Sequence, residues 1–436
     1  MIEPLRRSSA LLFLWLGLVW VTFELFLVLD WGHGQARVIL LAVLATLLWV
    51  CRRWAPWFRS LRTPSRATSH AAVVLVVIGA LANLGPWLYF VQQSLATHTV
   101  QSDQAETVMS ALDVLEQGAN PYGSDTVTDS VAYDLATEAL AAEPTCRGPG
   151  GAVKFRVGRA DDSTVPHIVR TAGCEDVQRM FSSLGFKYGP VMLAFYWPFI
   201  ALFGTAGFLI AHLVLVIAFS VLLYRTARET TGSTFWASIS LLPLLWPTVL
   251  AWNVLAKEHL DFLPICLVAV AWLCWSRGLF GAAGAFIGVS LAAKFLPALL
   301  FVPLLAKAPR RFWPVPVIVA AALFTPFAAW SWHGFWQNIG YPFTRPPDST
   351  AIVFFCTHAE RIGVRVLAIA ILGGLALRAH LRAWDRRSAV TYLVFAHIAV
   401  LASGTALHNN YLVWLLPLVS LYLTEEVGRT DAPVMQ

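Results

Sequence analysis

Long apolar runs recur along nearly the whole chain, and short clusters of polar or charged residues separate them. A run of about 20 apolar residues is long enough to cross the hydrocarbon core of a bilayer as a helix. The pattern predicts an all-α polytopic membrane protein, a bundle of about 12–13 transmembrane helices. Residues 188–224 hold apolar length for two crossings, although their flanks require an odd number. Either 188–204 is re-entrant, or the arginines that follow break the topology rule.

The charge pattern orients these spans. Arg6 and Arg7 precede the first apolar run, and a basic loop extends from Arg52 to Arg66, which the positive-inside rule places in the cytoplasm. The polar stretch 92–187 is therefore predicted to be extracytoplasmic. The net charge of +6 follows from such loops and does not indicate nucleic-acid binding. Only 13% of the residues are charged, whereas a soluble domain has about a quarter, so the composition also excludes an ordinary soluble domain.

Topology divides the chain into three parts. Residues 1–69 form an N-terminal two-span extension with a basic cytoplasmic loop, 70–425 form the main transmembrane unit, and 426–436 form a cytoplasmic tail. No cleavable signal peptide is expected, because the first apolar run is too long and a second follows at once.

A short amphipathic helix is predicted at the start of the extracytoplasmic stretch. After Asp103, apolar residues recur at helical spacing, namely Ala105, Val108, Leu112 and Leu115. Gly118 favours a helix stop, and the Asn-Pro pair at 120–121 favours a turn. A helix tethered to a span in this way would lie at the membrane interface, with its apolar face in lipid or on protein.

Asp103 opens this helix and has two interpretations. With Glu106 three residues later it resembles a capping box, which makes it a structural cap. Ser102 could provide the cap instead, and the carboxylate would then be available as a general base or a metal ligand.

Lys294 lies inside the apolar run GVSLAAKFLPALLFVPLL. A lysine at the bilayer centre costs about 2.5–3.5 kcal/mol, and less near the interface. Its ammonium is either a snorkelling group at a helix end or a cation for a phosphate at the outer leaflet.

Other polar clusters fall on the same outer side by this topology. Glu258 and His259, in the stretch 257–261, form either a solvated turn between spans or a substrate-facing group. His408 to Tyr411 is either an interfacial cap or a ligand-binding segment, and Arg361, near His358, is either an anchor or a partner for an anionic head group. Segments far apart in sequence therefore converge on one face, which predicts a single extracytoplasmic site.

Cys146 and Cys174 both lie in the outer loop and are a candidate disulfide if that loop faces an oxidising compartment. No Cys/His spacing indicates a metal site. No cofactor is firmly expected, and a role for a divalent metal stays open, because Asp103 and Glu106 are too few ligands to indicate one.

Several motifs occur in an order that resembles a known family. The helix ends in GANPYG, a Lys187-Tyr188-Gly189-Pro190 segment precedes the next span, Gly288 to Pro297 contains Lys294, and His408 to Tyr411 opens the last span. Over residues 70–425 this order resembles the GT-C superfamily of integral-membrane glycosyltransferases, and most nearly the bacterial polyprenyl-phosphate-mannose-dependent mannosyltransferases. The chain departs from the family where Gly189 replaces a proline, where Lys257-Glu258-His259 replaces a Gly-Gln pair, and in a long insertion at about 124–180.

The resemblance implies a GT-C-like catalytic unit in the bacterial inner membrane, with its active site facing the extracytoplasmic side. It would move a sugar, with mannose favoured, from a polyprenyl-phosphate donor to a glycan or glycolipid acceptor, and invert the anomeric carbon. Asp103 would be the general base, and Lys294 with Arg361 would bind the donor phosphate. The expected substrate-binding residues are Gln104, Glu106, Tyr122, Lys187, Tyr188, Glu258, His259, His358, His408 and Asn410. Membrane lipid would be the remaining partner.

Two other classes stay open. A transporter or flippase for a lipid-linked sugar predicts polar residues near the bilayer midplane and inverted halves. A non-catalytic partner of a cell-wall assembly complex would use the long outer loop as a binding module, and an inert substitution at Asp103 would favour it.

Overall fold

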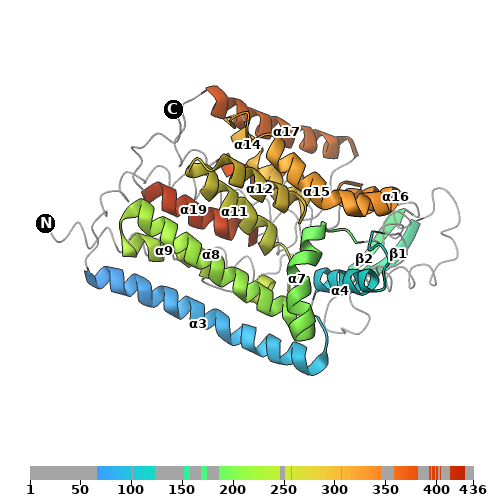
Figure 1. The fold of residues 1–436 in the computed structure, drawn as a ribbon, viewed down its shortest axis with the longest axis horizontal. Coiled ribbons are helices and arrows are strands. Elements are labelled where there is room, and N and C mark those ends of the chain that lie inside the picture. Colours follow the sequence, from blue (N-terminus) through green and yellow to red (C-terminus); the bar gives the residue numbers. More distant parts are fainter. Residues whose placement is uncertain are drawn as a thin grey trace.

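The computed structural model contains a bundle of helices that run largely along one axis (Figure 1). It describes residues 66–100, 102–122, 152–157, 168–173, 186–245, 251–256, 258–305, 307–344, 358–381, 392–393, 395–397, 399–400, 403 and 413–427. The bundle helices are α3 (Arg66–Thr97), α8 (Gly207–Thr231), α9 (Thr234–Leu245), α11 (Phe262–Ser276), α12 (Phe280–Leu291), α15 (Pro314–Trp330), α17 (His358–Leu381) and α19 (Leu415–Val427).

Shorter elements link or cap the bundle. They are α4 (Asp103–Glu116), α7 (Pro190–Phe203), η1 (Gly204–Ala206), the π-helix η2 (Ala251–Ala256), α13 (Phe295–Ala298), η3 (Leu299–Phe301), α14 (Val302–Leu305) and α16 (Trp332–Thr344). Figure 1 shows α4 and α16 together at one end of the bundle. The predicted amphipathic helix is thus confirmed as α4, and Gly118, with φ +76°, follows its end as expected.

Three stretches of the described residues are long and apolar enough to cross a membrane, at Arg66–Thr97, Pro190–Thr231 and Ile362–Leu381. Five shorter apolar helices accompany them. The prediction of an all-α polytopic membrane protein is confirmed. The number of spans stays a prediction, because the N-terminal extension, residues 1–65 in particular, and parts of the C-terminal third lie outside the described residues.

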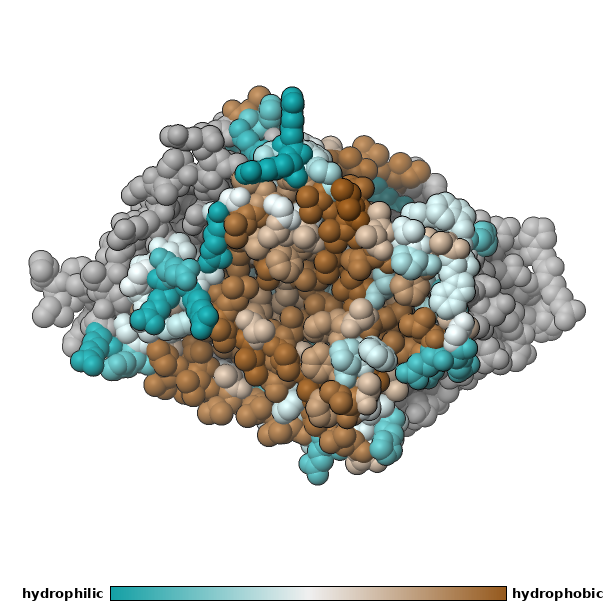
Figure 2. Space-filling model, viewed as in Figure 1, coloured by the Kyte–Doolittle hydropathy of each residue, from teal (hydrophilic) through white to brown (hydrophobic). Residues whose placement is uncertain are grey.

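An apolar band crosses the visible face of the bundle (Figure 2). Hydrophilic residues lie at both ends of the helices, with hydrophobic residues between them. Many large apolar side chains of the bundle helices are exposed, for example Leu81 on α3, Val317 on α15 and Ile369 on α17. Such a continuous exposed apolar surface fits contact with lipid rather than with water.

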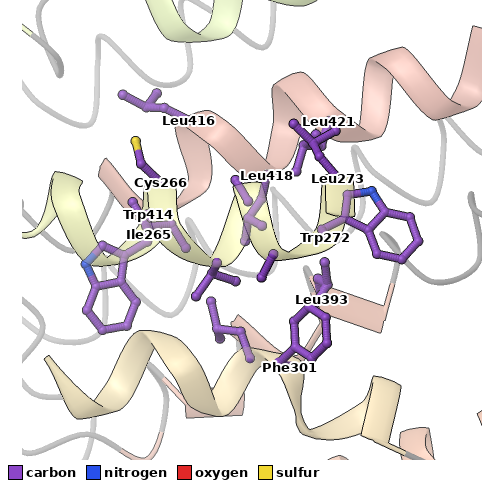
Figure 3. Close-up of a cluster of buried hydrophobic side chains, with 14 of the residues drawn as sticks. Ile265, Cys266, Trp272, Leu273, Phe301, Leu393, Trp414, Leu416, Leu418 and Leu421 are labelled. Atoms are coloured by element: carbon purple, nitrogen blue, oxygen red, sulfur yellow. The ribbon is translucent and has the colours of Figure 1, made fainter. Parts of the chain in front are cut away.

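The core lies around α11, which is apolar on every side and buried on nearly every side. It packs against α12, α8 and α19. Figure 3 shows buried side chains of α11 and of its neighbours, with Trp414 beside Ile265 near the start of the helix and Trp272 towards its other end. Because α11 is fixed from several sides, the residue before it, Asp261, is held at a fixed place at one end of the bundle.

The helix α7 bears on the topology of residues 188–224. Gly204 turns the chain at φ +58°, and a Cβ at Gly207 would overlap the backbone of Phe199, so α7 and α8 meet very closely. Figure 1 shows α7 lying across the end of the bundle, whereas α8 runs along it. This arrangement agrees with the re-entrant alternative for 188–204, and the number of crossings in the stretch stays a prediction.

The polar stretch 92–187 contributes an element that the apolar pattern did not predict. Strands β1 (Ala152–Val157) and β2 (Ile168–Gly173) pair antiparallel, with Ala152 opposite Gly173. They add a small two-stranded sheet to the helices that make up the rest of the described residues. Cys146 and Cys174, on either side of this hairpin in sequence, lie outside the described residues, and their disulfide stays a prediction.

Candidate functional site

The start of α4 is fixed by Ser102. Its extended backbone and its Oγ, which accepts from the Ala105 N–H at 3.0 Å, make it the N-cap. The same hydroxyl donates to the carbonyl of Glu258 at 3.2 Å. Of the two interpretations of this position, the structure supports the one in which Ser102 provides the cap, so the helix does not need the carboxylate of Asp103 for this purpose.

The apolar face of α4 packs on protein. Ala105, Val108 and Leu112 are buried in a cluster that also contains Tyr122 and Phe186. The helix is therefore held against the bundle, and residue 103 lies where this docked helix begins.

Asp261 and Lys294 form an ion pair at this end of the bundle. Lys294 Nζ lies 2.5 Å from Asp261 Oδ1, and the same oxygen accepts from Trp414 Nε1 at 3.1 Å. Gln104 Nε2 donates to Asp261 Oδ2 at 3.3 Å, while Gln104 Oε1 accepts from the Leu260 N–H at 2.9 Å. Four segments of the chain therefore meet at one carboxylate.

The environment of Asp261 shifts its acidity in two directions. Burial raises the pKa of the carboxyl, but the Lys294 charge and hydrogen bond, His259 and the Trp414 N–H together lower the pKa below its ordinary value. Asp261 is thus an anion whose oxygens are already hydrogen-bonded, and it would be a weak proton acceptor.

The turn that contains Asp261 is not solvated. Glu258 and Asp261 are both fully buried, so the interpretation of 257–261 as a simple solvated turn is wrong. Glu258 has φ +55°, a left-handed conformation that is costly for this residue type and is often found at functional sites. The bonds from Ser102 and Gln104 fasten this turn to α4.

Lys294 lies in the short turn between α12 and α13, directly before α13 begins. The segment before α7 lies directly against it, because the Gly189 N–H donates to Ala293 O at 2.9 Å and the Val191 N–H to Ala292 O at 3.0 Å. Gly189 allows this approach, since a Cβ there would overlap the Ala292 carbonyl.

The contact between the 188–191 segment and the turn before α13 brings an aromatic ring and two cations together. The Tyr188 ring centroid lies 5.6 Å from Lys294 Nζ and 5.8 Å from Lys187 Nζ. Both ammonium groups are within the range of a cation–π attraction. These two positive charges are therefore close to the same ring.

Tyr122, from the GANPYG turn, holds the backbone of Tyr188 in place through a hydrogen bond. It is fully buried and donates its hydroxyl to the Tyr188 carbonyl at 2.7 Å. Burial raises its phenol pKa well above the ordinary value, so it stays protonated. Asn120 and Asn338 hold the Tyr122 backbone, which ties the end of α4 to α16.

The structure thus brings together Gln104, Tyr122, Lys187, Tyr188, Glu258, His259 and Lys294 of the predicted site, with Glu106 on the second turn of α4. The side chains of Asp103, His358 and Arg361 lie outside the described part of the structure, as do His408 and Asn410 entirely. Within the described residues, no group of three or more His, Cys, Asp or Glu is placed to hold a metal ion.

Sequence reasoning did not single out Asp261 as the centre of the site and did not select Trp414. A carboxylate directly before a fully apolar helix was a usable signal, because such a charge requires a partner. Trp414 follows the predicted His408 segment by a few residues in sequence, and it reaches the site through its hydrogen bond to Asp261.

Comparison with known proteins gives one match. Residues 186–407 match the model of glycosyltransferase family 87. No curated protein and no solved structure matches the chain. The matched region contains Tyr188, Asp261 and Lys294, whereas α4 lies before it.

Proposed function

Because the chain belongs to glycosyltransferase family 87, a GT-C-type family of membrane glycosyltransferases, we propose that it uses a polyprenyl-phosphate sugar as donor. The sugar, with mannose favoured, passes to a glycan or glycolipid acceptor on the extracytoplasmic side of a bacterial inner membrane. The anomeric carbon is inverted, and Asp103 is the general base.

One observation supports this proposal most strongly. Ser102 and Gln104, the neighbours of Asp103, both bond to the turn 258–261, and Gln104 shares the Asp261 carboxylate with Lys294. The residues on both sides of Asp103 are therefore bonded to the turn that carries Asp261, the partner of Lys294. A base and a phosphate-binding cation are the two groups that this transfer needs.

The reaction follows from these two groups. The acceptor hydroxyl oxygen attacks C1 of the sugar, the bond between C1 and the phosphate oxygen breaks, and the bonding electrons leave with the polyprenyl phosphate. The carboxylate of Asp103 takes the hydroxyl proton. The leaving group is already an anion and needs no general acid, so one carboxylate suffices, in contrast to the pair used in glycoside hydrolysis. Lys294 stabilises the charge that grows on the departing phosphate.

The remaining predicted residues take supporting roles. Arg361 assists Lys294 at the phosphate, and His358, His408 and Asn410 bind the substrate from the C-terminal third of the chain. Gln104, Glu106, Lys187 and His259 border the sugar and the acceptor, while Tyr122, Tyr188 and Glu258 shape the site from within.

The test is sugar transfer by the purified full-length protein in lipid vesicles. Polyprenyl-phosphate mannose and other lipid-phosphate sugars serve as donors, and Asp103→Asn is compared with Asp113→Asn. Asp113 is exposed on the same helix, so it controls for loss of charge on α4. Loss of a general base should lower the rate by about 10²–10⁴-fold in the first variant only.

Two results would overturn the proposal. Full activity of the Asp103→Asn protein would exclude this residue as the base. If the wild-type protein transfers no sugar but moves a lipid-linked sugar across the vesicle membrane, the transporter interpretation replaces the transferase.

A further inference from the structure

Asp261 carries a negative charge at the place where the proposed donor phosphate binds, and this requires an explanation. We propose that Asp261 is a positioning residue for donor binding, which holds the Lys294 ammonium ready for the lipid phosphate without itself contacting substrate. This inference rests on the proposed function and adds a residue to it.

The two partners differ in exposure. The side chain of Lys294 is 13% exposed, and that of Asp261 is 0% exposed. An anion arriving from outside the protein can therefore reach the ammonium, while the carboxylate stays enclosed behind it. Lys294 lies between the two negative charges and screens one from the other.

Asp261 is oriented towards Lys294 rather than towards its own helix. It precedes α11, where a carboxylate would ordinarily cap the helix, yet its side chain makes no cap hydrogen bond. Its two oxygens accept from Lys294, Trp414 and Gln104, which come from three separate segments. A side chain held from three directions has a fixed position, and it transmits that position to the lysine.

A lysine needs such support more than an arginine would. Its stem of four carbons turns about several rotatable bonds, and its ammonium, unlike a planar guanidinium, has no fixed plane that orients its hydrogen bonds. At a membrane interface an unsupported lysine extends towards water. Asp261, together with the Tyr188 ring, keeps the ammonium at the protein surface of the site instead.

The hydrogen bonds from Trp414 and Gln104 also regulate how strongly Asp261 binds Lys294. Each N–H donor withdraws part of the negative charge from the carboxylate. These donors therefore leave less of the carboxylate charge to Lys294, which favours interaction of the ammonium with a phosphate oxygen as well. Trp414 itself is fixed by burial and by edge-to-face packing against His397.

The test measures transfer kinetics of the full-length protein in lipid vesicles, with donor and acceptor varied separately. Asp261→Asn removes the charge and keeps the shape, and Asp261→Glu restores the charge. We expect a rise of about tenfold in the donor KM for Asp261→Asn, partial recovery for Asp261→Glu, and an unchanged acceptor KM. Glu229→Gln removes a carboxylate from the Arg277 ion pair at a distant position and is the matched control.

A double variant separates positioning from an independent role. If Asp261 acts through Lys294, then Asp261→Asn adds no further loss of activity to Lys294→Met. Trp414→Phe removes one N–H donor from Asp261, keeps an aromatic ring, and remains informative if Asp261→Asn does not fold. We expect Trp414→Phe to change the donor KM and not the acceptor KM.

The outcomes are distinct. Three results would overturn the positioning role and leave the proposed function intact. The Asp261 and Trp414 variants could leave the donor KM unchanged, they could change the KM of donor and acceptor equally, or the double variant could show an additive loss of activity. If the wild-type protein transfers no sugar, the proposed function fails first. Farnesyl phosphate then serves as the probe in thermal-stability measurements. If it does not stabilise the wild-type protein more than the Asp261→Asn protein, the positioning role is overturned too.

Discussion

The two ends of α11 each carry an ion pair, and the two pairs are built differently. At the start, Asp261 and Lys294 are 2.5 Å apart, nearly enclosed, and bonded to Gln104 and Trp414. At the end, Arg277 and Glu229 are 3.2 Å apart, with side chains 38% and 69% exposed. The same helix therefore connects an enclosed ionic cluster to an open one.

The difference shows which end is specialised. An exposed pair contributes about 0–1 kcal/mol and serves as an interfacial anchor, which fits a basic residue at a predicted cytoplasmic helix end. An enclosed pair is costly to desolvate and often adds little net stability over apolar side chains. Its presence at the end where α4 docks is more readily explained by chemistry than by folding.

The largest expected effect follows from separating the enclosed pair. Lys294→Met leaves the buried Asp261 carboxylate without its cation, which should lower the free energy of unfolding by about 3–5 kcal/mol. Transfer activity should fall at least about a hundredfold, since the phosphate loses its cation. Thermal unfolding and transfer rates, measured on the same preparation, check both effects.

The neutral double variant sharpens this result. Asp261→Asn combined with Lys294→Met removes both charges and should recover much of the stability but none of the activity. Recovery of activity along with stability would mean that the pair is structural, and the two ends of α11 would then differ only in burial.

The second effect concerns two glycines, Gly189 near the enclosed ion pair and Gly278 near the exposed one. Gly189 has an ordinary backbone conformation, yet an added Cβ would overlap the carbonyl of Ala292. Gly189→Ala should therefore displace Tyr188 from Lys294 and lower transfer by at least about tenfold, with a clear loss of thermal stability. A fully active Gly189→Ala protein would show that the seating of Tyr188 on the α12 segment is not required.

Gly278, directly after Arg277, is the matched position. It has φ +75° and nothing within 4 Å of an added Cβ. Gly278→Ala should cost only about 1–2 kcal/mol of stability through backbone strain and leave transfer unchanged. Kinetics and thermal unfolding of the two glycine variants, measured side by side, test the comparison.

The contacts of Gly189 also explain why a glycine stands here where the family that the sequence resembles has a proline. The Gly189 N–H donates to Ala293 O, and a proline has no N–H to donate. The sequence showed the substitution, but its reason depends on the α12 segment, about 100 residues away. Local signals, in contrast, were sufficient for α4, because apolar spacing and Gly118 define its extent within the helix itself.

The sequence indicates that Asp261 needs a partner, but it could not show the burial of its turn or which residues are the partners. The stretch 257–261 is polar and lies between apolar runs, so its composition is that of a solvated turn. Its burial comes from α4, and its ion pair from Lys294 and Trp414, which lie far along the chain. The apolar composition of α7 did not reveal its orientation, because a helix that crosses the end of a bundle has the same composition as one that spans a membrane. Only the charges that flank 188–224 raised the re-entrant alternative.

A third effect is the response of the enclosed pair to acid. The pKa of Asp261 is lowered in the folded protein, so its contribution to stability is complete above the unfolded value of about 3.9 and is lost as the pH falls through the folded value. Below about pH 4, the wild-type protein should therefore lose thermal stability more steeply than the neutral double variant. Melting temperatures in detergent from neutral to acidic pH measure the two slopes, and equal slopes would contradict this assignment.

The smallest effect belongs to the exposed pair. Glu229→Gln leaves Arg277 with its hydrogen bond to Thr226 Oγ1 at 3.1 Å and with access to water, so the loss of stability should be at most about 1 kcal/mol. Salt screens an exposed pair far more than an enclosed one, so even this difference should vanish at high ionic strength. Thermal unfolding at low and high salt, with the donor KM measured in parallel, tests the contrast directly. Glu229→Gln could instead change the donor KM as much as is expected for Asp261→Asn. Donor binding would then respond to a charge change at either end of α11, and the ion pair at Asp261 would have no special role in it.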